Sequence, residues 1–99
     1  MDELNNFTGT VSRIINANDT DINTAEEVKV SGYYLEYEDI LFFKFREDLV
    51  FSKTKQIADR VLVDFDENDI AISLEIIKAS LCSSKQIEEY LELVGYYRN

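Results

Sequence analysis

The sharpest local pattern of oxygen-bearing side chains in the sequence lies between residues 64 and 69. Asp64, Asp66 and Asn68 alternate there, Asp69 follows, and Glu75 stands further on. Oxygen ligands at the first, third, fifth and twelfth positions are typical of a calcium-binding loop. Such a loop needs glycine at the position of Asp69 and helices on both sides, whereas these flanks alternate as strands do. The segment is therefore predicted to be an acidic hairpin turn rather than a metal site.

Two further carboxylate pairs, Glu38-Asp39 and Glu47-Asp48, have the residue types of an acid–base catalyst. They stand at expected turns, where solvent gives a carboxyl group no reason to change its pKa. Histidine, the commonest general base, is absent from the sequence, so Cys82 has no imidazole partner. A half-buried structural thiol is the expected role of Cys82. We predict a non-enzymatic protein with no cofactor and no metal.

Tyrosines lie near many of the carboxylates. Tyrosine anchors protein contacts, while carboxylates steer a partner and pair with its lysines and arginines. Adjacent tyrosines such as Tyr33 and Tyr34 cannot both face a core if the local structure is regular. This composition predicts a surface that engages a basic protein. The predicted partner-binding residues are Glu36, Glu38, Asp39, Asp64, Asp66, Glu67, Asp69, Tyr34 and Tyr37.

The overall charge limits the choice of partner. Twenty acidic and ten basic side chains give the 99 residues a formal charge of −10. Half of the cations lie close together: Lys44, Arg46, Lys53, Lys55 and Arg60. Phe42 shares a face with Lys44 and Arg46, as on an RNA-binding sheet, but the remaining charge opposes nucleic acid. We expect no direct nucleic-acid binding, and these cations are expected to offset carboxylates on neighbouring strands.

The sequence also bears on the compartment. One cysteine cannot form an internal disulfide, which favours a reducing interior. No stretch approaches the ~20 apolar residues that span a bilayer, so no membrane association is expected. The start, Met1-Asp2-Glu3-Leu4, has neither the basic beginning nor the apolar run of a signal peptide. We expect a cytoplasmic protein of a microbe or of a phage-infected host cell.

The candidate residues must be positioned by short strands. Residues 1–26 form an N-terminal extension with a possible strand over 7–15 and a polar loop over 16–24. From residue 27 to residue 80 the apolar residues alternate in strands joined by short polar turns, which predicts an antiparallel meander. Its strands are expected near 28–37, with a break at Gly32, and at 40–46, 49–55, 61–66 and 70–76.

The apolar period changes after Ser80. Ser83 and Gln86 have the spacing of a capping box, which predicts a helix over 83–97 with Gly95 near its end. The helix has one apolar stripe, made of Ile87, Tyr90, Leu91 and Val94. The predicted fold is a single α+β domain over residues 1–99. It consists of a small antiparallel β-sheet of about five strands with a C-terminal helix packed on one face.

Two segments carry a family resemblance. Val61-Leu62-Val63-Asp64-Phe65-Asp66-Glu67 and Ile72-Ser73-Leu74-Glu75-Ile76-Ile77-Lys78-Ala79-Ser80 resemble the patterns V-I-V-D-Y-D and I-V-G-I-E-I-L-x-A-S. These patterns belong to a family of short prokaryotic domains of unknown function, and the resemblance covers residues 28–80. Asp69 and Ser73 stand where that family has glycine. The resemblance implies a small β-rich domain followed by a helix, and it implies no catalytic residue.

Two functions remain open at this point. The first is a small protein-binding module that engages a basic protein surface. A concrete form is an inhibitor of a nucleic-acid-binding enzyme that mimics nucleic acid, of the phage anti-CRISPR or anti-restriction type. The second is a structural or regulatory homo-oligomer, such as a homodimer, or an antitoxin-like protein without mimicry.

Overall fold

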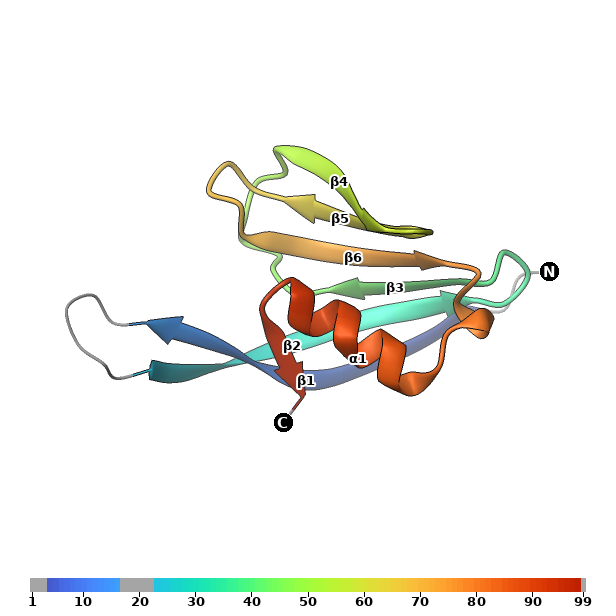
Figure 1. Cartoon of the computed structure of the whole chain (residues 1–99), viewed down its shortest axis with the longest axis horizontal. Coiled ribbons are helices and arrows are strands. Elements are labelled where there is room, and N and C mark those ends of the chain that lie inside the picture. The colour runs from blue at the N-terminus through green and yellow to red at the C-terminus, as the bar shows by residue number, and fades with distance from the viewer. Residues whose placement is uncertain (1–3, 17–22, 99) are drawn as a thin grey trace.

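The computed structural model describes residues 4–16 and 23–98, which form seven strands, a 3₁₀ turn and one α-helix (Figure 1). The strands are β1 (Leu4–Asn16), β2 (Asn23–Leu35), β3 (Ile40–Lys44), β4 (Lys53–Ala58), β5 (Val61–Phe65), β6 (Ala71–Ile77) and β7 (Tyr96–Arg98). The 3₁₀ turn η1 spans Ala79–Leu81, and the helix α1 spans Ser84–Leu93. All strands belong to one curled antiparallel sheet with the order β4-β5-β6-β3-β2-β1-β7.

The prediction of an α+β domain with about five strands is wrong. The domain is mostly β, with seven strands and one short helix. The two additional strands come from the chain ends: β1 lies in the segment expected to be an extension, and β7 lies in the segment expected to be helical. β1 pairs with β2 on one side and with β7 on the other. The sheet therefore recruits both ends of the chain.

The long hairpin of β1 and β2 corrects two further expectations. Thirteen residue pairs join the strands without a register shift, so Gly32 does not break β2. A Cβ on Gly32 would lie 2.1 Å from the Phe42 carbonyl oxygen and 2.5 Å from Phe7 Cζ. Glycine is thus the residue that lets β3 and the Phe7 ring approach β2 closely. The predicted polar loop lies partly outside the described residues, and its first and last positions belong to the strands.

The strand order differs from the predicted meander because β6 lies between β3 and β5. β6 is the most completely buried strand. Its central position gives it a neighbouring strand along each edge, which suits an apolar segment. The connection from β3 must therefore reach the far edge before β4 begins. β4 starts at Lys53 rather than at residue 49, because its partner β5 ends at Phe65, opposite Lys53. Val50 and Phe51 are left exposed in the connection.

The capping-box prediction is confirmed at α1. The Gln86 N–H donates to Ser83 Oγ over 3.1 Å, and the Ser83 N–H donates to Gln86 Oε1 over 2.9 Å. The helix ends at Leu93, four residues earlier than predicted, and Gly95 follows with φ +95°. That left-handed conformation suits glycine and turns the chain back toward the sheet.

The core lies between α1 and one face of the sheet. Val61, Val63, Leu74 and Ile76 have no exposed surface. Leu91 contributes from the helix, and Tyr96 inserts from β7. The opposite face, with Tyr33, Phe42 and Lys44, carries no helix within the described residues; we call it the open face (Figure 1). No helix of the described chain is long and apolar enough to cross a membrane.

Candidate functional site

Five of the predicted partner-binding residues meet at the turn between β2 and β3. Glu36, Tyr37 and Glu38 are exposed there, and Tyr37 is 71% exposed. Asp39 closes the turn in the left-handed region, with φ +56°. Aspartate tolerates that conformation better than most residues because its short side chain makes local hydrogen bonds. The turn thus presents a tyrosine between two carboxylates.

Asp39 holds this turn in place. Its carboxylate accepts hydrogen bonds from Tyr34 Oη (2.7 Å), from the Ser80 N–H (2.9 Å) and from Ser80 Oγ. Its carbonyl oxygen accepts from the Ala79 N–H over 3.0 Å. The hydrogen bonds from Ser80 and then from Tyr34 keep the pKa of Asp39 below its usual value. The same contact raises the pKa of Tyr34, because ionising the phenol would remove the donated proton.

The bonds to η1 bring another exposed apolar residue to this end of the sheet. Leu81 follows Ser80 directly and is 65% exposed. We define the turn surface as Glu36, Tyr37, Glu38 and Leu81, with Tyr34 and Asp39 as its support. Exposed aromatic and aliphatic residues together with carboxylates at one end of a sheet have a composition common on protein-binding surfaces.

The predicted residues after β5 have a structural role. Asp66 is buried, and its Oδ1 accepts hydrogen bonds from the Asn68 N–H (2.9 Å) and the Ile70 N–H (2.8 Å). Asp66 therefore shapes the β5–β6 turn, as aspartate commonly does. Asp69 makes an ion pair with Lys53 of β4, and this pair lowers the pKa of Asp69. Glu67 is exposed at the tip of the turn.

Asp64 lies on the open face rather than in the turn. Its carboxylate accepts hydrogen bonds from Thr54 Oγ1 (2.6 Å) and Ser73 Oγ (3.0 Å). Asp64 pairs with Ser73, so Glu75 stands two residues further along β6. Within residues 4–16 and 23–98, no group of three or more His, Cys, Asp or Glu side chains is placed to hold a metal ion.

Apart from Asp64 on the open face, the structure therefore divides the predicted residues into two groups. The turn surface follows β2 and precedes β3, whose first residue Ile40 pairs with Ile77 at the end of β6. The β5–β6 turn lies at the beginning of β6 (Figure 1). Seven strand residues separate these ends, which is roughly 20 Å. The two groups are separate surfaces on the molecule.

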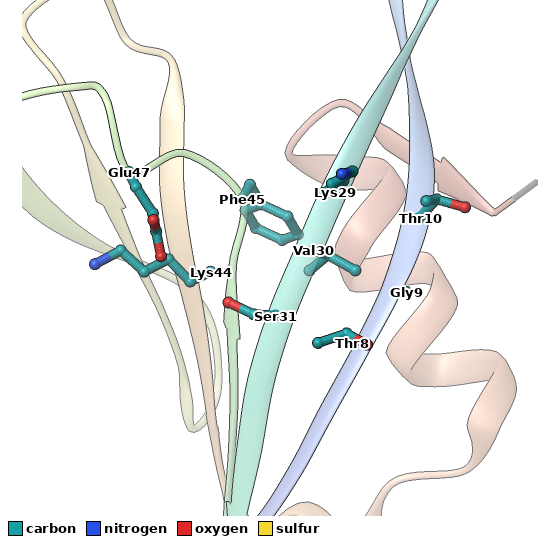
Figure 2. Close-up of a pocket in the computed structure, with 9 residues that line it drawn as sticks. All are labelled: Thr8, Gly9, Thr10, Lys29, Val30, Ser31, Lys44, Phe45 and Glu47. Atoms are coloured by element: carbon teal, nitrogen blue, oxygen red, sulfur yellow. The ribbon is translucent and has the colours of Figure 1, made fainter.

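A groove on the open face was not among the predicted sites. It has a volume of about 600 Å³, and Figure 2 shows its lining side chains on β1, β2 and β3 and just after β3. Thr8 pairs with Ser31, and Ser31 pairs with Lys44, so the three side chains form one row across the strands. Alternation along the sequence placed Phe42 and Lys44 on one face. The register that adds Thr8 and Ser31 depends on pairing between distant segments.

The cations of the described chain differ in whether they are neutralised. Arg46 makes a two-pronged contact with Asp48, through Nε–Oδ1 (2.9 Å) and Nη2–Oδ2 (2.8 Å), and this contact raises the pKa of Arg46. Four other cations also form ion pairs: Arg13, Lys53, Arg60 and Arg98. Lys29 and Lys44, which line the groove, form no ion pair with a described carboxylate. The groove thus holds two positive charges that no ion pair of the described chain neutralises.

Comparisons with known proteins give no relative: no family model, no curated protein and no solved structure matches this chain.

Proposed function

We propose that this protein is a non-enzymatic protein-binding module that engages a basic protein through its turn surface. The observation that carries the proposal is the exposed Tyr37 side chain between Glu36 and Glu38. Leaving a large aromatic side chain in water has an energetic cost that burial by a partner would remove. The flanking carboxylates would steer and pair with lysines and arginines of that partner.

The support beneath the turn favours binding without rearrangement. Asp39 links the turn to Ser80 of η1 and to Tyr34 of β2. A preorganised turn loses little conformational entropy when a partner docks, so more of the contact energy appears as affinity. We further propose that the partner is a nucleic-acid-binding enzyme and that the carboxylates take the place of phosphates.

The test begins with capture of partners from the native host by the full chain, followed by mass spectrometry. Binding of each captured protein is then measured by calorimetry for the wild-type chain and for two variants. Tyr37→Ala should weaken binding by roughly thirtyfold, as expected for a central anchor. Glu36→Gln combined with Glu38→Gln should weaken binding at low salt and much less at high salt.

Glu67→Gln is the matched control, because it removes an exposed carboxylate at the other end of the sheet. It should bind like the wild type. Equal affinity of all variants for every captured protein would refute the turn surface as the binding site. If the partner binds nucleic acid, this protein should compete with the nucleic acid for the partner. Simultaneous binding of this protein and nucleic acid to the partner would refute mimicry but not protein binding.

A second candidate function is homo-oligomer formation through β1. β7 pairs only with Val11, Ser12 and Arg13, so the edge over residues 5–9 has no neighbouring strand in the described chain. Residues 5–9 are uncharged. The strand at the opposite edge, β4, carries Lys53, Lys55 and a β-bulge, and these features discourage pairing with another strand. A second copy could extend the sheet there.

Light scattering tests this candidate. Pairing through β1 would be supported if the wild type is a dimer and Gly9→Lys converts it to a monomer. Gln56→Lys on β4 is the control, and it should leave the dimer intact. A wild-type monomer at micromolar concentration would refute it.

A further inference from the structure

The open face carries two neighbouring rows of side chains with different chemistry. In the first row Asn6 pairs with Tyr33, and Tyr33 pairs with Phe42. The Tyr33 and Phe42 rings stack, with centroids 5.0 Å apart and planes 20° from parallel. In the second row Thr8, Ser31 and Lys44 stand two residues further along the same strands. The rows are therefore about 7 Å apart.

The two rows border two hollows that share three lining residues. Thr8, Ser31 and Lys44 line both the groove of about 600 Å³ and a smaller hollow of about 280 Å³. Tyr33 and Phe42 line the smaller one. Sites for small molecules have volumes of about 300–1,000 Å³ and combine apolar walls with a few polar groups. An aromatic wall thus adjoins a groove in which hydroxyl and ammonium groups stand beside the apolar residues Val30 and Phe45.

The charges of the second row favour an anion. Lys44 and Lys29 have no ion-pair partner among the described carboxylates, and Thr8 and Ser31 add hydroxyl groups to the lining of the same groove (Figure 2). Glu47 is the one carboxylate that lines the groove. In Figure 2 the Lys44 side chain extends away from Ser31. Its flexible four-carbon stem allows the ammonium group to turn over the row when an anion arrives.

We infer that this groove and the adjoining smaller hollow together bind a nucleotide, with its base against the Tyr33–Phe42 pair in the hollow and its phosphate at Lys44, Ser31 and Thr8. A nucleotide separates its base from its phosphate by one sugar, which is comparable with the spacing of the rows. Every base has a flat face that stacks on an aromatic ring, and lysine is a common phosphate ligand. This inference is independent of the turn surface.

The charge of the whole molecule favours a single nucleotide over a strand. Each additional phosphate would approach a body with a formal charge of −10. Glu75 stands directly beside Phe42 on β6, and Glu27 lies beyond Lys29 on β2. Glu75 thus continues the first row and Glu27 lies past the groove along β2, so both carboxylates would repel a polyanion that extends beyond the groove.

The experiment is an amide NMR titration of the full chain with adenosine monophosphate, adenosine, inorganic phosphate and a short adenine oligonucleotide. Adenosine monophosphate should shift the amides of Thr8, Ser31 and Phe42 saturably and bind at least about tenfold more tightly than adenosine or phosphate. The oligonucleotide should bind no more tightly per site than the mononucleotide.

Variants distinguish the groove from non-specific attraction. Lys44→Met and Phe42→Ile should each weaken mononucleotide binding by about tenfold. Lys55→Met is the control, because Lys55 stands on β4 over the Phe65 ring, away from the groove; it should bind like the wild type. Each variant spectrum also reports whether the fold is intact.

Three results would overturn the inference. The first is the absence of saturable shifts with the mononucleotide. The second is an equal effect of Lys44→Met and Lys55→Met. The third is binding of the oligonucleotide alone, which would assign the open face to single-stranded nucleic acid.

Discussion

The phenol oxygen of Tyr34 lies 2.7 Å from Asp39 Oδ1, and this hydrogen bond joins β2 to the turn that follows it. Ser80 binds the same carboxylate from η1, 41 residues away in the sequence. Two segments that are distant along the chain are therefore joined at one side chain. The exposed Tyr37 stands on the turn that this carboxylate supports.

Asp39→Asn should lower the unfolding free energy at about pH 7, because the charged acceptor is lost. The hydrogen bonds keep the pKa of Asp39 below 3.8, its usual value when unfolded. The folded state therefore binds the proton of the Asp39 carboxyl group less tightly than the unfolded state does. The stabilisation is present above pH 3.8 and is lost as the pH falls through the lower pKa of the folded state. The difference between variant and wild type should disappear in strong acid.

Urea unfolding from about pH 7 down to about pH 2 checks this prediction. Glu38→Gln is the control, because Glu38 is the exposed neighbour of Asp39 in the same turn. If Asp39→Asn and Glu38→Gln change the unfolding free energy equally at every pH, Asp39 does not hold the turn.

Tyr96→Phe should destabilise the protein by about 1 kcal/mol at neutral pH. Tyr96 is 1% exposed, its ring stacks on Phe45 with centroids 4.0 Å apart, and its hydroxyl donates to the Ala71 carbonyl over 2.8 Å. Burial raises the pKa of Tyr96 above 10.0, so the folded state prefers the neutral phenol. This contribution is complete below about pH 10 and is lost as the pH rises through the folded pKa.

The variant should therefore lose less stability than the wild type as the pH rises above about 10. Denaturant unfolding at each pH measures the difference. Tyr97→Phe, at the exposed neighbouring position, should follow the wild type throughout. A steeper alkaline loss in Tyr96→Phe would contradict the predicted role.

Ser83→Ala should lower the unfolding free energy by about 1 kcal/mol, the usual cost of removing a helix N-cap. The hydroxyl of Ser83 accepts from the Gln86 N–H, which no carbonyl of the helix can satisfy. Thermal and urea unfolding measure the loss. Ser84→Ala, one residue later, removes a hydroxyl but leaves the capping box intact, and it should leave stability nearly unchanged.

Local patterns in the sequence predict several elements of this fold well. The hairpin of β5 and β6 and the start of α1 follow from alternation, turn residues and the Ser83–Gln86 spacing, which all act within a few residues. The end of the helix is different. Tyr97 fits the helical stripe, but Tyr96 enters the core and pairs opposite Arg13, a contact between the two ends of the chain. No local pattern specifies such a contact.

The same distinction applies to the candidate sites. Glu36, Tyr37 and Glu38 were predicted from composition and neighbouring residues, and the structure places them together because they are adjacent in the sequence. Asp66 was predicted as a surface carboxylate, but two backbone N–H groups bind it inside the turn. The groove joins three strands, and its row of side chains follows only from the strand order that brings β1, β2 and β3 together.

Gly32→Ala should destabilise the protein by about 3 kcal/mol, the upper end of the range for overpacking. The new Cβ would lie 2.1 Å from the Phe42 carbonyl oxygen, which belongs to the backbone and cannot rotate away. Gly9→Ala is the matched control on the neighbouring strand, because its nearest atom, Val30 Cγ1, is 3.8 Å from the new Cβ. Gly9→Ala should be neutral or stabilise the strand by less than about 1 kcal/mol, since alanine has less freedom to lose on folding. Urea unfolding of both variants measures the contrast, and equal stabilities would show that β2 and β3 do not approach as closely as Gly32 allows.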